Sequence, residues 1–233
     1  MLRLAVGRRW RRFAGELVQR SWERARSLGA LHPESVRAAR FGHLGRGSLI
    51  GFPNTALFGE RWMHIGDETL IGPWVTLTAG YMPDQPDVPD RALVIGDRCV
   101  IGARSSIIAH SSITIGDDVW FGEDVFVTDA NHGYEDPTLP IGRQIADAEP
   151  VAIGAGSWLG HGAIVLPGAD VGRHVVVAAG SVVRGVVPES CVVAGSPARV
   201  VRRRCSDGQW RRVARTGGTT DEVPGDGPPT LLE

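Results

Sequence analysis

The stretch IGAGSW LGHGAI VLPGAD VGRHVV VAAGSV, residues 153–182, repeats one pattern every six positions. An aliphatic residue opens each unit, and a small or β-branched residue stands four positions later. A period of six fits neither an α-helix, at about 3.6 residues per turn, nor the alternation of a long strand. We predict an all-β solenoid in which each unit is a short strand plus a turn and three units complete one triangular coil.

The same rhythm recurs earlier in the chain, from Ile65 to Val127, so the predicted solenoid begins well before residue 153. We expect its opening residues to fill the interior of the prism while Gly and Pro turn the corners. A β-sandwich is the alternative, but its strands normally recur every 8–12 residues or so. The earlier opening residues are Ile65, Ile71, Leu77, Ile95, Ile101, Ile107, Ile115, Phe121 and Val127.

Composition divides the chain into three regions: a basic helical segment at 1–40, the solenoid at 41–204 and a flexible tail at 205–233. The first region should contain a short amphipathic helix, either lying on an anionic membrane or docking on the solenoid or a neighbouring subunit, and we favour docking. The tail is rich in Gly, Pro and acidic residues, which predicts disorder.

The charge and cysteine content narrow the class of protein. A formal net charge of -1 argues against a nucleic-acid partner. Three widely spaced cysteines argue for a reducing compartment rather than a disulfide scaffold. The sequence contains neither a transmembrane run nor a secretory signal. We therefore expect a cytoplasmic protein, peripheral to the inner face of the membrane if residues 1–30 bind lipid.

Two segments interrupt the repeat, at residues 80–92 and 128–152. Solenoids place their insertions as loops, often on the binding face, and function concentrates on loops held by rigid scaffolds. The second loop contains DANHGYEDP, residues 129–137, with a histidine at position 132. His132 is the catalytic candidate, although a loop histidine can also be an inert surface residue.

The repeats, the loop DANHGYEDPTLPIGRQ (129–144) and the segment from PVAIGAGSW to AGSPARVVR (150–202) resemble the hexapeptide-repeat acyltransferases, in particular the branch that O-acetylates sugars and polysaccharides. This resemblance implies a left-handed parallel β-helix, a homotrimer with active sites between subunits, and acetyl-coenzyme A as cosubstrate. The left hand of the coil comes from the resemblance alone.

The resemblance also implies that His132 is the general base, with Asn131 beside it. A sugar hydroxyl is a poor nucleophile, and an imidazole with an ordinary pKa of about 6.5 can take its proton during attack on a thioester. No Cys or Ser stands in a nucleophile setting beside His132. We therefore expect direct transfer in a ternary complex rather than a covalent acyl-enzyme.

The matching donor-side positions would bind coenzyme A through backbone groups, one tryptophan and arginines near its phosphates. His161 stands where many relatives have a small hydroxyl or amide residue, which leaves the oxyanion donor open. Trp158 could instead pack at a corner, and each arginine could be a solvated surface charge. The predicted cofactor-binding residues are Trp158, Gly160, His161, Ala179, Gly180, Arg184, Arg199 and Arg202.

Predictions for the acceptor side are less specific. The loop residues could hydrogen-bond a sugar or hold the loop closed on itself, and His110 could line the cleft or be an ordinary corner residue. The predicted acceptor is a hydroxyl of a sugar or of a cell-surface polysaccharide precursor. The predicted substrate-binding residues are Asp129, Tyr134, Asp136, Gln144 and His110.

Three alternatives remain open on sequence. An acetyltransferase could act on an amine or on an antibiotic or other xenobiotic hydroxyl. A zinc enzyme would need His110, His132 and His161 to converge, and we expect no metal. The β-helix could also be a non-catalytic scaffold for assembly.

Overall fold

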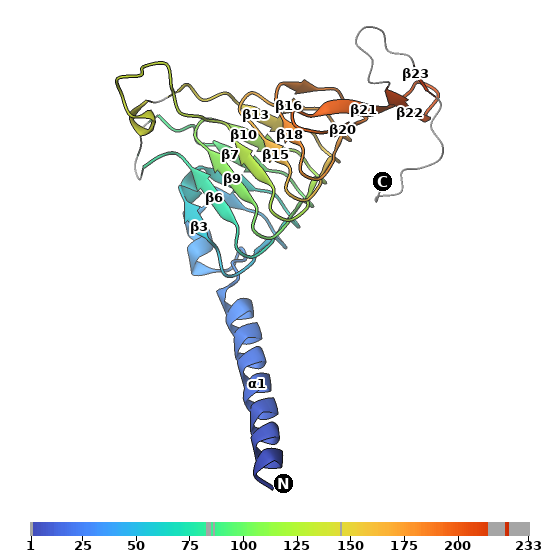
Figure 1. The fold of residues 1–233 in the computed structure, drawn as a ribbon. Helices are drawn as coiled ribbons and strands as arrows, with labels where there is room; N and C mark the ends of the chain where they lie inside the picture. Colours follow the sequence, from blue (N-terminus) through green and yellow to red (C-terminus); the bar gives the residue numbers. More distant parts are fainter. Residues whose placement is uncertain (1, 83–84, 86, 145, 214–221, 224–233) are drawn as a thin grey trace.

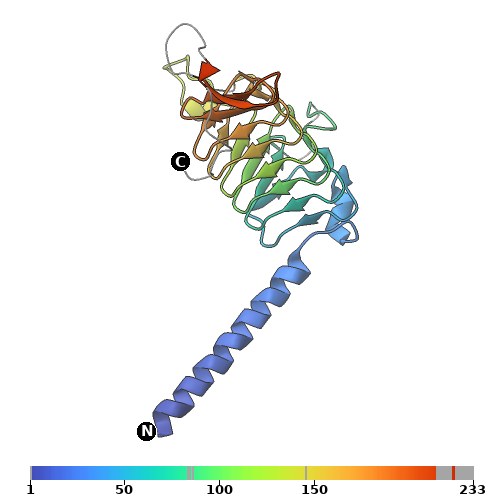
Figure 2. The same ribbon diagram turned by 90° about the vertical axis from the view of Figure 1, so that its right-hand side faces the viewer.

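The computed structural model describes residues 2–82, 85, 87–144, 146–213 and 222–223. Within these residues the strands form three sheets, and successive strands from the first to the twentieth belong to the first, second and third sheet in turn (Figures 1 and 2). Each strand of one coil pairs in parallel with the equivalent strand of the next. The chain thus winds around one core, as the six-residue repeat predicts; its hand stays a prediction.

All three sheets are built from short strands. The first sheet contains β1 (His43–Leu44), β4 (Met63–Ile65), β7 (Leu93–Ile95), β10 (Ile113–Ile115), β13 (Val151–Ile153), β16 (Asp170–Val171) and β19 (Val186–Val187). The second contains β2 (Leu49–Ile50), β5 (Leu70–Ile71), β8 (Val100–Ile101), β11 (Trp120–Phe121), β14 (Trp158–Leu159), β17 (Val176–Val177), β20 (Cys191–Ala194), β21 (Arg199–Arg204), β22 (Trp210–Val213) and β23 (Glu222–Val223). The third contains β3 (Ala56–Phe58), β6 (Thr76–Ala79), β9 (Ser106–Ala109), β12 (Phe126–Thr128), β15 (Ile164–Val165) and β18 (Val182–Val183).

The repeat positions form the core. Ile95, Ile115 and Ile153 are buried register neighbours in the first sheet, so one aliphatic column runs from coil to coil. The small fourth-position residues are buried as well, because they lie where the chain bends. At one of them, Ser157 Oγ donates to the Gly172 carbonyl at 3.1 Å and accepts from the Val175 N–H at 3.0 Å. The predicted interior is therefore confirmed.

Two of the three corners of the coil differ in shape. We call the corner between the second and third sheets the tight corner, because every coil turns there within a few residues. Gly162 and Gly180 take positive φ values of 66° at this corner, a conformation that glycine adopts without strain. We call the corner between the third and first sheets the loop corner, because residues 80–92 and 128–152 leave the coil there. The 3₁₀-helix η3 (Ile141–Arg143) lies in the second of these loops.

The helix α1 (Leu2–Gly29) is longer than the short helix predicted from sequence, with 28 residues. It projects away from the coil (Figures 1 and 2), so it does not dock on its own solenoid; docking on a neighbouring subunit, the other half of that prediction, stays a prediction. Short 3₁₀-helices η1 (Val36–Arg40) and η2 (Glu60–Trp62) follow it. In the described part of the chain, no helix combines the length and apolar character needed to cross a bilayer.

The tail also differs from expectation. Trp210–Val213 form β22, which pairs antiparallel with β21, so disorder does not begin at Cys205. Antiparallel pairing continues the second sheet beyond the last complete coil. Composition misses this strand because the Gly and Pro content of the tail lies mostly further on, at positions 214–221 and 224–233, which are outside the described residues.

Candidate active site at the loop corner

The loop corner gathers polar residues from three successive coils. Tyr81 follows β6, His110 follows β9, and Asn131 and His132 follow β12. These three strands are neighbours in the third sheet. Parallel strands in register end at the same edge, so the residues after them lie at adjacent levels of one corner.

Asp129 fixes the backbone of this corner. Its side chain is fully buried, and its carboxylate accepts hydrogen bonds from the backbone N–H groups of His110, Ser111 and Ser112 at 2.7–2.8 Å. Its own carbonyl accepts from the Glu149 N–H at 2.7 Å, where the second loop returns. The structure thus gives Asp129 a positioning role in place of the substrate contact predicted from sequence.

His110 packs against Tyr81, with ring centroids 3.8 Å apart. Partial burial lowers the pKa of His110; the charge of Asp129 acts in the opposite direction, and a charged His132 would lower the pKa further. The buried Nδ1 of His110 has no hydrogen-bond partner among the described residues. Burial, with a contribution from Asp129, raises the pKa of Tyr81. His110 is therefore part of the corner that carries His132, and its role as a substrate contact stays a prediction.

His132 and Asn131 are exposed at the base of the second loop. The Nδ1 of His132 lies 3.4 Å from the Gln144 carbonyl oxygen, and the next residue, Gly133, donates its N–H to the same oxygen at 3.1 Å. The contact with the Gln144 carbonyl therefore orients the imidazole ring of His132 from the side of the loop. An exposed imidazole in this position can exchange a proton with a molecule bound at the corner.

Two predicted substrate contacts instead close the loop on itself. Gln144 donates from its amide to the carbonyls of Asp136 and Leu139 and accepts from the Asp136 N–H. Asp136 accepts from the N–H and hydroxyl of Thr138, and these bonds lower the pKa of its carboxyl group. Tyr134 is exposed and remains open to a bound molecule.

The tight corner brings together four of the predicted cofactor-binding residues. The Gly160 N–H donates to the Val177 carbonyl at 2.8 Å, and the Gly180 N–H donates to the His161 carbonyl at 2.9 Å. A Cβ on Gly160 would lie 2.6 Å from the Ala179 nitrogen, so this stacking requires glycine. The result is a narrow track of backbone and small side chains.

The other predicted cofactor-binding residues are more scattered. Trp158 lies on the outer face of the second sheet, in β14, rather than at a corner. Arg199 and Arg202 lie on β21, which continues that sheet. Arg184 follows β18 and therefore lies at the loop corner, away from the tight corner.

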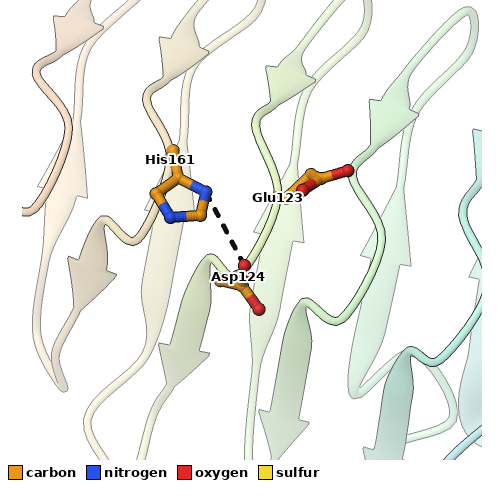
Figure 3. Close-up of side chains that lie close together, drawn as sticks. All are labelled: Glu123, Asp124 and His161. Atoms are coloured by element: carbon orange, nitrogen blue, oxygen red, sulfur yellow. Dashed lines mark ion pairs between the residues drawn. The ribbon is translucent and has the colours of Figure 1, made fainter.

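A charged cluster occupies the tight corner beside His161. The Nδ1 of His161 lies 3.6 Å from Asp124 Oδ2, and the carboxylate of Glu123 is close by (Figure 3). Arg104 already pairs with both carboxylates, at 2.8 Å to Asp124 and 2.5 Å to Glu123. Within the described residues this is the one group whose ligand atoms are spaced for a metal ion. Since His161 is at this corner and His110 and His132 are at the other, one chain does not bring the three histidines together.

Sequence reasoning missed Tyr81 and Arg104. Tyr81 is one residue into the first loop, so the interruption of the repeat was the available signal. Arg104 offered no signal, because its partners lie 19 and 20 residues further along the chain, on the next coil.

Two family models match the chain. Residues 150–185 match the bacterial transferase hexapeptide (six repeats), and residues 92–128 match the hexapeptide repeat of succinyl-transferase. The AntD N-acyltransferase from Bacillus cereus, solved with dTDP and 3-hydroxybutyryl-CoA, superposes with a TM-score of 0.62 at 19% identity, over 76% of this chain and 90% of AntD. That likeness concerns the fold.

Curated relatives are acetyltransferases by name. The putative lipopolysaccharide biosynthesis O-acetyl transferase WbbJ of Escherichia coli (strain K12) is 41% identical over 85 residues, 34% of this chain and 43% of WbbJ. The probable acetyltransferase Rv3034c of Mycobacterium tuberculosis is 34% identical over 144 residues, 62% of this chain and 43% of that protein. The chain thus spans less than half the length of these two relatives, and the predicted resemblance to hexapeptide-repeat acyltransferases is confirmed.

Proposed function

Because the chain carries the hexapeptide repeats of bacterial transferases, we propose that it is an acetyl-coenzyme A-dependent O-acetyltransferase acting on a sugar or glycan hydroxyl. The observation that carries this proposal is the loop corner. There an exposed His132 lies on a loop that is closed by its own hydrogen bonds, beside a half-buried His110 and above a backbone fixed by Asp129.

His132 acts as the general base. It takes the proton of the acceptor hydroxyl while the hydroxyl oxygen attacks the carbonyl carbon of the thioester. The tetrahedral intermediate carries a negative oxygen, which needs a preorganised donor. Its collapse breaks the carbon–sulfur bond, and the coenzyme A thiolate leaves and takes up a proton. The products are an acetyl ester and free coenzyme A.

The tight corner is the proposed binding track for the donor. Its glycine-lined backbone offers N–H and C=O groups along an uninterrupted edge of the coil, which suits an extended pantetheine arm. AntD, which shares the fold, was solved with an acyl-coenzyme A, and this supports a thioester donor. Trp158 would pack beside the arm, and Arg199 and Arg202 would face the phosphates.

The acceptor would bind at the loop corner. Tyr81 and Tyr134 present aromatic rings there, and such rings commonly pack on the faces of sugars. Gln144 and Asp136 would act indirectly, by keeping the loop closed. The name of WbbJ, a putative lipopolysaccharide O-acetyl transferase, supports a glycan acceptor over an amine or an antibiotic.

One chain does not complete this site. The tight corner and the loop corner lie at opposite edges of the third sheet, and about five extended residues separate them, roughly 16 Å. A second copy must therefore bring its tight corner to the His132 of the first, as in the homotrimer that the family resemblance implies. The proposed assembly is a closed ring. Each copy contacts the next through two different surfaces, and such contacts form a closed assembly only when the copies are related by rotation.

A ladder of apolar side chains on the outer face of the second sheet offers a surface for that second copy. Neighbouring strands place these residues in register, and several of them are exposed to solvent. An exposed apolar patch of this length is typical of a subunit interface. The ladder contains Leu49, Leu70, Val100, Trp120, Trp158 and Val176.

The test is the release of thiol from acetyl-coenzyme A in the presence of sugars, nucleotide sugars and amines. The parent should release thiol with a hydroxyl acceptor, whereas His132→Ala should lose about 10²–10⁴-fold in rate. Coenzyme A binding, measured by calorimetry, should be the same in both. His174→Asn is the matched control, because His174 is an exposed histidine at the third corner, with a φ of 53° that asparagine tolerates.

The outcomes separate the candidate functions. Transfer to amines and not to hydroxyls would favour an N-acetyltransferase. Failure to bind coenzyme A at all would favour a scaffold without catalysis. Equal transfer rates in the parent and His132→Ala would reject His132 as the base.

A further inference from the structure

The helix α1 extends from the coil without packing on it. Its 28 residues make it about 42 Å long. Just beyond its end, Leu31 and Ile50 exchange two backbone hydrogen bonds at 2.8 and 2.9 Å, which anchor the helix to the coil. From that anchor it points away from the coil, opposite to the last strands (Figures 1 and 2).

One face of the helix carries an exposed apolar stripe. Trp10, Phe13 and Leu17 are spaced by three and four residues, which places them on one side of a helix. They are 67%, 62% and 56% exposed, and the rings of Trp10 and Phe13 lie 6.2 Å apart. Large apolar side chains grouped in this way favour a surface that removes them from water.

The same part of the helix is strongly basic. Its first half contains five arginines and no acidic residue before Glu16. At 100° per residue, four of these positions fall on the flanks and back of the stripe rather than within it. A narrow apolar stripe between cationic flanks is the pattern of helices that lie in the interface of a bilayer. The five arginines are Arg3, Arg8, Arg9, Arg11 and Arg12.

We propose that α1 binds the surface of an anionic lipid bilayer, with its apolar stripe facing the acyl chains and its basic half close to the lipid phosphates. Charge complementarity carries the choice of occupant. A second copy of α1 fits less well, since the five arginines of each helix would repel one another. In addition, the three-and-four spacing continues from Leu17 to Arg20 and Arg24, so a seam between helices would bury arginines.

Vesicle co-sedimentation of the full chain tests this proposal. The protein should bind vesicles of phosphatidylcholine mixed with phosphatidylglycerol, bind pure phosphatidylcholine far more weakly, and be released by salt, because screening weakens surface attraction. Trp10→Ser should weaken binding about tenfold by removing one large apolar anchor. Trp22→Ser is the matched control, because Trp22 lies about 120° around the helix from Trp10.

Every other outcome counts against the proposal. Equal binding to neutral and anionic vesicles would reject the role of the arginines. Equal losses of binding in Trp10→Ser and Trp22→Ser would reject the apolar stripe as the face that binds lipid. No binding to either vesicle would reject the proposal outright. A change in oligomeric state with Trp10→Ser would assign the stripe to contacts between copies. Since none of these readouts uses acetyl transfer, they stand apart from the test of the proposed enzyme.

Discussion

The two corners that bound the third sheet follow the same repeat but expose different chemistry. At the tight corner the repeat is unbroken, and what lies exposed there is mostly backbone, small residues and the paired charges around Arg104. At the loop corner the repeat is interrupted twice, and the interruptions place Tyr81 and His132 near His110, which lies at an uninterrupted turn. The difference teaches that an unbroken repeat places similar backbone positions at each level of a corner, whereas a loop that leaves the coil can add a histidine beside them.

The largest expected effect is the loss of transfer activity when either the loop corner or the tight corner is mutated. His132→Ala should remove the base, and Ala179→Trp should block the track, so each alone should lose transfer by about 10²–10⁴-fold. If each site combines one loop corner with the tight corner of a neighbour, random mixed assemblies should recover about a quarter of the parent activity. The measurement is transfer after co-expression of both variants. No recovery would mean that each chain holds a complete site.

Removing the carboxylate of Asp129 should damage the loop corner most. Asp129→Ala leaves three backbone N–H groups without their acceptor, and hydrogen bonds to a charged group contribute about 1.5–3 kcal/mol each without adding fully. We expect a loss of about 3 kcal/mol in the free energy of unfolding, measured in urea. Asp136→Ala, on the exposed loop, is the control and should change the midpoint little. Equal losses of unfolding free energy in Asp129→Ala and Asp136→Ala would mean that the three hydrogen bonds of Asp129 do not stabilise the corner.

Changing the ring of Tyr81 should have a moderate effect on catalysis. Tyr81→Ala removes the packing against His110, and the acceptor KM should rise about tenfold, since an aromatic pair contributes about 0.5–1.5 kcal/mol beyond its buried area. Tyr81→Phe keeps the ring and should retain a KM close to that of the parent. An equal rise in both variants would assign the effect to the hydroxyl group instead.

The core of the coil and the position of the second loop could be predicted from the sequence. The six-residue period predicts the buried columns, such as Ile153 and Leu159, because every repeat must bury the same position. The period also identifies where the chain leaves the coil, and hence the place of His132. It could not assign Asp129, because an aspartate is normally exposed and its three partners belong to the previous coil. Tyr81 was missed for the same reason: its contact with His110 joins two coils.

The smallest expected effect concerns the pH dependence of stability at the loop corner. A lowered pKa of His110 means that the folded protein binds this proton less readily than the unfolded chain. Its contribution to stability is therefore complete above the ordinary histidine pKa of about 6.5 and declines as the pH falls below it. His110→Gln, which cannot titrate, should lose less stability than the parent between neutral and mildly acidic pH, by thermal unfolding. An identical pH profile in both proteins would contradict this.

The hydrogen bond from the Glu149 N–H to the Asp129 carbonyl, at 2.7 Å, joins the two ends of the second loop. The coil therefore continues as though the residues between them were not inserted. Lengthening a surface loop whose ends are already held together changes its closure entropy only slightly. Insertions in that loop should therefore cost little free energy of folding, and His132, close to one of the joined ends, should keep its place when the loop is lengthened.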